Sequence, residues 1–279
     1  MEKEILAEID KAVRRANFSL RRDVFVLIEK AYKLEKNKKA KLALSWIIEN
    51  VKIAKKKNLA ICQDTGFPLG FITGGKKVKV DSALIENIKK SIELSYKRNY
   101  LRASIVSPFF RGKPGYKGVT VYLDFNPKIR GLEVVVFPKG FGSENKTKLK
   151  MFNPTISFKE IEDFIITAIR EAGPQACPPF IVGVGIGGDS SYALYLAKKA
   201  LVERIDKPNR DKFLASLEKR LLRRINSLNI GPMGLGGKTT ALAVKIKTHP
   251  THIAGLPVGV NISCWALRSA RVKINNVKS

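Results

Sequence analysis

Three cysteines are the residues of this sequence best suited to chemistry. Cys62, Cys177 and Cys264 lie far apart, and no two form a Cys-x-x-Cys pair. An odd number of cysteines does not indicate a disulfide framework, and the absence of Cys-x-x-Cys pairs excludes a zinc ribbon. Brought together by the fold, three thiolates could hold one metal cluster and leave one coordination position open. Spacing alone equally fits small, buried side chains without a chemical role, which are common for cysteine.

Both histidines precede the third cysteine. An alternating run, Ala241–Lys247, is followed by His249, a turn at Pro250 and His252, and a second apolar run then ends at Cys264. Loops at strand ends often display reactive groups. A histidine beside apolar residues can also be merely hydrogen-bonded, so the pattern alone leaves both interpretations open.

The elements that would position these residues alternate between helix and strand. Apolar side chains at helical spacing predict helices over Glu2–Asn17, Arg21–Lys36 and Lys38–Lys57. We therefore expect residues 1–58 to form a helical N-terminal segment of one domain, a bundle packed on a mixed α/β region over 59–279. Further expected helices cover 82–96, 158–172, 190–205 and 209–228; expected strands cover 59–62, 71–73 with 77–80 as a hairpin, 118–125, 132–137, 180–186, 241–247 and 258–262. The fold class is α+β, or mixed α/β.

Two glycine-rich stretches imitate nucleotide-binding motifs. The run Gly183–Gly188 matches G-x-G-x-x-G, but the helix after it leads into a second helix instead of a strand with an acidic end. Gly237-Lys238-Thr239 resembles the end of a phosphate loop, but Pro232 stands where a glycine is needed, and a strand follows in place of a helix. Close packing of a helix on a strand explains the first run better.

The net charge of +28, from 52 Lys and Arg against 24 Asp and Glu, invites a nucleic-acid partner. The cations stand at helical spacing among acidic and apolar residues, and no zinc-finger spacing or basic tail accompanies them. The charge also suits a dianionic substrate or an acidic partner subunit. A basic nucleic-acid-binding protein with inert cysteines stays as the alternative from another class. No apolar run reaches the ~20 residues of a membrane span, and the N-terminus is no signal peptide, so a cytoplasmic location is expected.

Six segments taken together resemble one enzyme family, in order and over nearly the whole chain. They resemble the α subunit of two-subunit class I fumarate hydratases and of L(+)-tartrate dehydratase. The segments are ICQDTG (61–66), LRASIVSP (101–108), PKGFGSENKTKLKM (138–151), ACPPFIVGVGIGG (176–188), IGPMGLGGKTTALAV (230–244) and PTHIAGLPVGVNISCWA (250–266).

The resemblance implies that Cys62, Cys177 and Cys264 bind a [4Fe–4S] cluster whose fourth iron has no protein ligand. That iron would act as a Lewis acid on the substrate hydroxyl in the reversible dehydration of (S)-malate to fumarate. Tartrate or a related hydroxy-dicarboxylate is the alternative substrate.

The resemblance also assigns site residues. Asp64 and His252 would be catalytic, and Gln63, Arg102 and Gly142 would bind substrate. Without it, Asp64 fits a turn cap, Arg102 a surface arginine and Gly142 a plain turn glycine. Lys238, Arg268 and Arg271 receive no assigned role.

The family pattern further implies a partner. In single-chain relatives a C-terminal domain supplies the base and two more cationic groups, whereas this sequence ends at Ser279. We therefore expect a separate β subunit, little activity without it, and a homodimer or an α2β2 assembly. Ile105–Lys117 is shorter than the family pattern, and Ser107 and Trp265 stand where histidines are common. These departures put the substrate in question more than the cluster.

Overall fold

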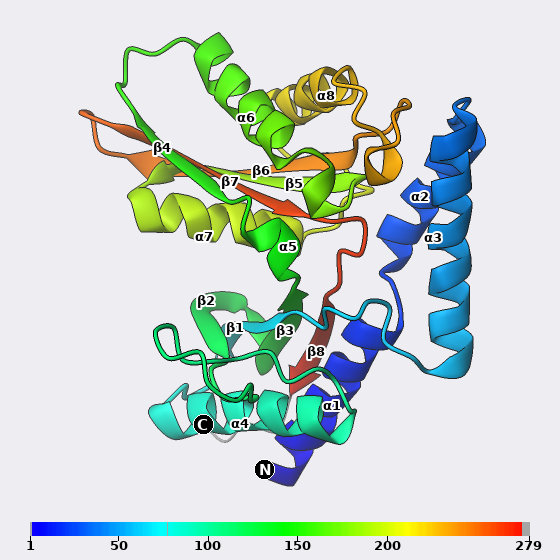
Figure 1. The fold of residues 1–279 in the computed structure, drawn as a ribbon. Coiled ribbons are helices and arrows are strands. Elements are labelled where there is room, and N and C mark those ends of the chain that lie inside the picture. Colours follow the sequence, from blue (N-terminus) through cyan, green and yellow to red (C-terminus); the bar gives the residue numbers. More distant parts are fainter. Residues whose placement is uncertain (1, 77, 275–279) are drawn as a thin grey trace. The chain divides into compact units, whose positions relative to one another are not determined.

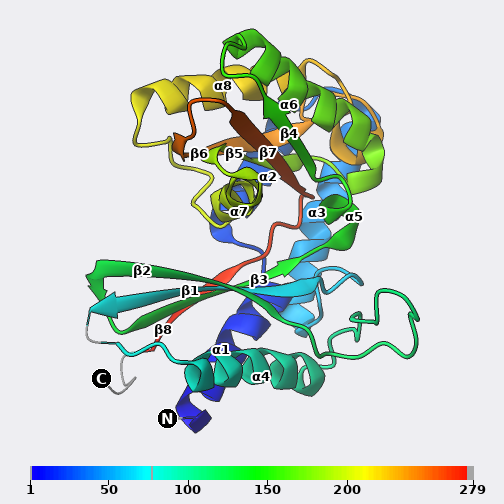
Figure 2. The same ribbon diagram turned by 90° about the vertical axis from the view of Figure 1, so that its left-hand side faces the viewer.

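The computed structural model describes residues 2–76 and 78–274, and its contacts divide the chain into two compact units (Figures 1 and 2). Unit 1 contains Met1–Arg21, Val51–Gly140 and Arg268–Ser279, and unit 2 contains Arg22–Asn50 and Phe141–Leu267. This division differs from the one expected at residue 58. Helical periodicity reveals an apolar face but not which sheet that face covers.

Unit 1 is a four-stranded sheet with helices on one face. The strand order is β2-β1-β3-β8, with β1 parallel to β2 and β3 antiparallel to both β1 and β8. Its elements are α1 (Glu2–Phe18), β1 (Phe67–Lys76), α4 (Ser82–Arg98), β2 (Thr120–Arg130), β3 (Leu132–Lys139) and β8 (Ala270–Ile274). Helices α1 and α4 lie on the same side of the sheet (Figure 2), where Ile9 and Ile88 are fully buried with Val134.

Unit 2 has a second four-stranded sheet, ordered β4-β7-β5-β6, in which β5 and β6 are parallel. Helix α7 covers one face, and α6 and α8 cover the other (Figure 1). The elements are α2 (Arg22–Leu34), α3 (Lys38–Lys57), α5 (Phe141–Glu144), β4 (Lys148–Phe152), α6 (Phe158–Ala172), β5 (Phe180–Gly188), α7 (Ser190–Leu201), α8 (Lys212–Asn226), β6 (Ala241–Thr251) and β7 (Leu256–Ser263), with 3-10 turns η1 (Gly173–Ala176) and η2 (Pro232–Gly234). From Val51 onward, α3 belongs to unit 1.

The mixed α/β fold class is confirmed, as are several local predictions. Helix α6 begins at a capping box of Ser157 and Glu160, and its C-cap is Gly173. The glycine run in β5 permits close helix packing, as expected. A Cβ added at Gly183 or Gly185 would lie 2.1 Å or 2.0 Å from a carbonyl oxygen of α7. These glycines therefore bring helix and strand together, with no nucleotide needed to explain them.

Other local predictions were wrong. Leu59–Cys62 is not a strand but an irregular segment before β1. Nor does a hairpin form at Gly74-Gly75, because β1 continues to Lys76. A Cβ added at Gly75 would lie 2.5 Å from the carbonyl oxygen of Ile129, so the glycine serves a close backbone approach. Of the expected return strand, Lys77 lies outside the described residues, and 78–80 are irregular.

Helices α1 and α2 contact different sheets. Helix α1 packs on α4, β3 and β8 in unit 1, whereas α2 contacts β6 in unit 2. Their amphipathic sequences were read correctly as helices, but the partners of their apolar faces depend on strands that come much later in the chain.

A buried carboxylate, Glu162 at 7% exposure, joins α6 to α8. On α6, Glu162 accepts hydrogen bonds from Arg220 and Arg224 of α8, with shortest contacts of 2.6 Å and 2.9 Å. Among the helices that the structure describes, none combines the length and apolar character needed to cross a lipid bilayer.

Candidate functional site

The loop that carries Cys62 is fixed before it enters β1. Backbone N–H of Ile61 donates to the Asn17 carbonyl at 2.9 Å, and N–H of Gly66 donates to Asp64 Oδ1 at 2.9 Å. Gly66 has φ of +79°, and an added Cβ would lie 2.7 Å from Pro138 C, so both backbone angle and space require glycine there. Cys62 and Asp64 are half-buried, and Gln63 is exposed.

Thr65 joins this loop to Arg102. The backbone N–H of Arg102 donates to Thr65 Oγ1 at 3.1 Å, and the hydroxyl of Tyr96 donates to the Thr65 carbonyl at 3.1 Å. Burial raises the pKa of Tyr96 well above its ordinary value, so the phenol stays a neutral donor. The Arg102 side chain is exposed. Unit 1 thus brings the segment Cys62–Asp64 and Arg102 together.

Arg268 is a residue of unit 1 to which the sequence assigned no role. It is 2% exposed, and its Nε and Nη1 have no hydrogen-bond partner among the described residues. A Cβ added at Gly140 would lie 3.4 Å from Asp64 Oδ2 and 3.7 Å from Arg268 Nη2, so both side chains approach this glycine. The one available sequence signal was an arginine within an apolar stretch, four residues after Cys264.

In unit 2, Cys177 and Cys264 lie on adjoining turns. Cys177 follows η1 with a left-handed backbone, φ 53°, and its carbonyl accepts a hydrogen bond from Trp265 N–H at 3.2 Å. The next carbonyl, of Pro178, accepts from Met233 N–H at 2.8 Å. Both cysteines are half-buried, and all three cysteines of the chain remain thiols.

Gly142 lies beside the turn that leads to Cys177. It is exposed in α5, and the atom nearest to an added Cβ would be the Gln175 carbonyl oxygen at 3.9 Å. Glu144 fixes this short helix, because it accepts a hydrogen bond from Asn261 Nδ2 at 2.8 Å and pairs with Lys198 at 2.6 Å. Unit 2 therefore gathers Gly142 with Cys177 and Cys264.

His252 lies elsewhere in unit 2, in the connection between β6 and β7. Cys264 follows the other end of β7, whose 8 residues at about 3.3 Å each span roughly 26 Å. The structure therefore does not bring His252 beside Cys177 and Cys264. His252 is exposed, and its Nδ1 accepts from Ala254 N–H at 3.2 Å.

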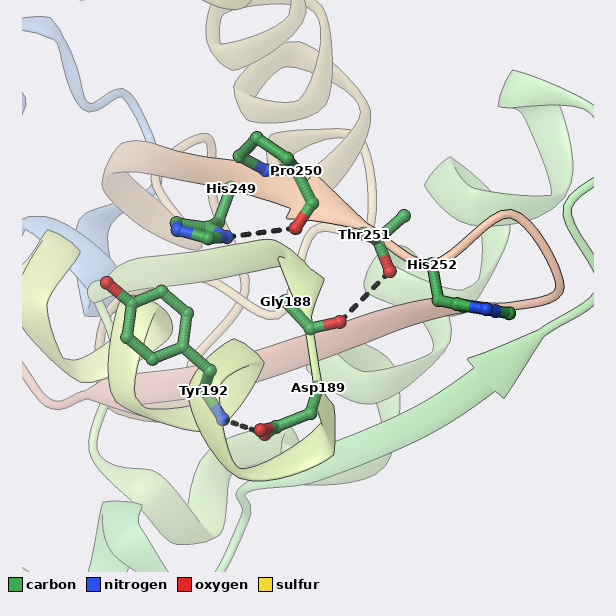
Figure 3. A pocket seen from close by; sticks show the side chains of 7 residues that line it. All are labelled: Gly188, Asp189, Tyr192, His249, Pro250, Thr251 and His252. Atoms are coloured by element: carbon green, nitrogen blue, oxygen red, sulfur yellow. Dashed lines mark hydrogen bonds between the residues drawn. The ribbon is translucent and has the colours of Figure 1, made fainter.

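A pocket of about 510 Å³ includes both histidines and the N-terminus of α7 (Figure 3). His249 meets the Tyr192 ring edge-to-face at 4.8 Å, whereas His252 points away from that ring (Figure 3). Asp189 caps α7 by accepting from Tyr192 N–H. His249 thus has a packing role, while the His252 ring is available to solvent.

The donor set suits an iron–sulfur cluster. Thiolates are the soft ligands that hold such clusters, and Cys177 and Cys264 are already neighbours. Within the described ranges, no three His, Cys, Asp or Glu side chains gather into one group. The third thiol, of Cys62, belongs to unit 1.

Known proteins match this chain over almost its full length. The family model described as fumarate hydratase (fumerase) matches residues 6–273. The "Putative L(+)-tartrate dehydratase subunit alpha" of Methanocaldococcus jannaschii is 42% identical over 271 residues, covering 94% of this chain and 95% of the relative. The L(+)-tartrate dehydratase subunit alpha of Escherichia coli K12 is 28% identical over 257 residues, covering 91% and 85%.

Proposed function

Because this chain belongs to the fumarate hydratase family and is therefore a hydro-lyase, we propose that it is the α subunit of a [4Fe–4S] enzyme that interconverts (S)-malate and fumarate. The observation that carries the proposal is the backbone hydrogen bond from Trp265 to Cys177, which joins two thiol-bearing turns at 3.2 Å.

Cys62, Cys177 and Cys264 are the proposed cluster ligands. When bound, a [4Fe–4S] cluster with one iron open to substrate supplies Lewis-acid activation of the substrate hydroxyl. Half-burial supports this role, because a thiol at the boundary of an apolar run can meet a cluster and still leave a path for substrate.

Asp64 is the proposed proton donor to the leaving hydroxyl. As the C–O bond of malate breaks, the departing hydroxide takes the Asp64 proton and leaves as water, while a base of the partner takes the C3 proton. The hydrogen bond from Gly66 N–H leaves Asp64 Oδ2 to face Gly140 and Arg268. This fixed orientation supports a directed proton transfer.

The substrate carboxylates are proposed to bind to Arg102, Gln63 and the backbone N–H of Gly142. A planar guanidinium suits bidentate contact with a carboxylate, and the exposed side chain of Arg102 can reach one. His252 is proposed to donate a hydrogen bond to substrate or to move a proton. Its exposed ring supports that role.

A β subunit is the proposed partner, because both relatives are described as subunit alpha. It would supply the base and further cationic groups, in a two-fold assembly such as α2β2. A cytoplasmic location belongs to the same proposal, since three thiols that hold a cluster require a reducing compartment.

L(+)-tartrate is the second candidate substrate. The names of the relatives favour it. Tartrate differs from malate by one additional hydroxyl, so a site that binds this group would discriminate strongly between the two.

The test is anaerobic purification of the chain with its β subunit, rebuilding of the cluster, and an assay with each substrate. We expect malate to give the higher kcat/KM and the isolated α chain to give little turnover. A preference for tartrate would select the second candidate. Full activity of the isolated α chain would exclude the two-subunit proposal, and colourless protein without visible cluster absorbance would exclude the cluster.

A further inference from the structure

The loop over 229–240 in unit 2 has the backbone of an anion-binding loop. Left-handed or other positive φ values occur at Asn229, Gly231, Met233, Gly234, Gly236 and Gly237. Successive residues of alternating hand turn their backbone N–H groups toward a common concave side, which is how many loops hold phosphate. The resemblance of Gly237–Thr239 to a phosphate loop therefore has a physical basis, although the sequence spacing is wrong.

The anion at this loop is a side chain of the same unit. Backbone N–H of Lys238 donates to Oε2 of Glu35 at 2.8 Å. The Oε1 atom accepts from the N–H groups of Lys36 and Asn37, each at 2.9 Å. Glu35 is only 3% exposed, so three backbone donors replace the water that its buried carboxylate has lost.

The fit between carboxylate and loop is close. A Cβ added at Gly237 would lie 2.7 Å from Glu35 Oε2 and 2.9 Å from Ala40 Cβ, and Gly237 has φ of +97°. The side chain of Lys238 is exposed, so only its backbone makes the contact. The loop thus donates one backbone N–H, that of Lys238, to the Glu35 carboxylate, where a phosphate-binding loop would donate to a phosphate.

The opposite side of the loop supports the turn that carries Cys177. Met233 N–H donates to the carbonyl of Pro178 at 2.8 Å, and a Cβ added at Gly234 would lie 2.3 Å from Pro174 Cβ. Pro174 and Pro178 flank Cys177 along the chain. A continuous series of contacts therefore runs from Glu35 through the loop to the backbone around Cys177.

We propose that Glu35 is a positioning residue for Cys177. Its carboxylate holds the glycine-rich loop in one conformation, and the loop in turn fixes the backbone that presents the thiol. The consequence for cluster retention rests on the proposed function, whereas the consequence for Cys177 itself does not. The same carboxylate excludes phosphate from the loop, so this loop is no nucleotide site.

The test compares Glu35→Ala and Glu35→Gln with the exposed control Glu49→Gln in α3, using the reduced full chain without cluster. Alkylation of each cysteine by iodoacetamide is followed by peptide mass spectrometry, with Cys62 as the reference within the same molecule. We expect Glu35→Ala to raise the Cys177 rate roughly fivefold relative to Cys62, equivalent to about 1 kcal/mol of easier local opening. Glu35→Gln retains one acceptor oxygen, so its Cys177 alkylation rate should lie between those of the wild type and Glu35→Ala. Glu49→Gln should match the wild type.

Gly237→Ala tests the same contact while Glu35 stays in place, and it decides the matter if Glu35→Ala does not fold. It should raise the Cys177 rate as well. An unchanged Cys177 rate in the folded variants, or an equal rise at Cys62, would overturn the proposal.

Cluster retention provides the second measurement. After reconstitution, Glu35→Ala should lose visible absorbance several times faster in air than the wild type and Glu49→Gln; equal loss would overturn the link to the cluster. If the wild type takes up no cluster, the proposed function fails, and the alkylation rates still decide the role of Glu35.

Discussion

The loop around Cys62 and the turn around Cys177 present their thiols in different ways. In the first, side chains act beside a backbone hydrogen bond from Ile61 to Asn17: the Asp64 carboxylate and the Thr65 hydroxyl accept hydrogen bonds from backbone N–H groups. In the second, backbone groups meet backbone groups, from Met233 and from Trp265. A backbone contact persists as long as the loop keeps its conformation, whereas a side-chain contact is lost when that one residue is replaced. The Cys62 loop therefore combines support with the proposed catalytic groups, while backbone contacts alone support the Cys177 turn.

The largest effect is expected when one of the two compared thiols, that of Cys62 or that of Cys177, is replaced. Cys62→Ser and Cys177→Ser should each lower malate turnover by the α–β complex by at least about a thousandfold, because several kcal/mol of Lewis-acid stabilisation are lost. Turnover and visible absorbance are the measurements, with Glu49→Gln as the control. Full turnover in either serine variant would remove that cysteine from the ligand set.

The next effect concerns the reactive side of the Cys62 loop. Asp64→Asn keeps an oxygen to accept from Gly66 N–H but loses the acid, so kcat should fall about 10²- to 10⁴-fold while the cluster spectrum persists. Asp81→Asn makes the same charge change at the N-cap of α4, where asparagine caps equally well, and should leave kcat unchanged. If Asp64→Asn retains normal kcat, Asp64 is not the proton donor, and the Cys62 loop has only a supporting role.

A smaller effect is expected at the far end of β7. Because Ala254 N–H donates to Nδ1 of His252, the neutral ring carries its proton on Nε2, where it can reach a ligand. His252→Gln should lower kcat/KM about tenfold, as one hydrogen bond to a charged group is weakened. His249→Gln, in the same pocket, is the matched control and should change kcat/KM little. If His252→Gln and His249→Gln had equal kcat/KM values, His252 would not be a residue of the active site.

The smallest effect concerns the stability of unit 2. Burial would raise the pKa of Glu162, but the hydrogen bonds from Arg220 and Arg224 outweigh it and hold that pKa below the ordinary 4.5. A carboxyl with a lowered folded-state pKa stabilises the fold above its unfolded-state pKa, and this contribution disappears as pH falls through the folded-state value.

Glu162→Gln should therefore lower the free energy of unfolding at neutral pH by about 1 kcal/mol, given that both arginines are partly exposed. Urea denaturation measures the difference, which should shrink as the pH falls below 4.5, the ordinary pKa of a glutamate side chain. Lys219→Gln on α8 is a control outside this ion-pair group. If the difference in the free energy of unfolding between Glu162→Gln and the wild type became larger at acidic pH, the ion pairs of Glu162 would not stabilise the fold.

Local features of the fold could be predicted where one segment decides its own structure. Helix α6 is an example: Ser157 and Glu160 form its capping box, and Gly173 ends it. The close approach of α7 to β5 was also readable, because Gly183 and Gly185 stand on one face of the strand. Half-burial of the three cysteines agrees with their positions at the boundaries of apolar runs.

Features set by distant partners could not be predicted. Gly75 looked like a turn residue, but the neighbouring backbone at Ile129 is what requires a glycine there. The buried Arg268 and the buried Glu35 have no distinctive local pattern, because their environments come from segments far along the chain. Which sheet each N-terminal helix covers also depends on pairings such as that of β3 with β8.

The pairing of β8 with β3 has a consequence for synthesis on the ribosome. All four strands of unit 2 are translated before β8, whereas the sheet of unit 1 needs β8 against β3, a partner made more than a hundred residues earlier. Unit 2 can therefore complete its sheet first, while the edge of β3 stays unpaired until β8 has been made. The loop bearing Cys62, Asp64 and Thr65 enters β1 of this later sheet, so the loop with the proposed site residues is stabilised after the sheet of unit 2.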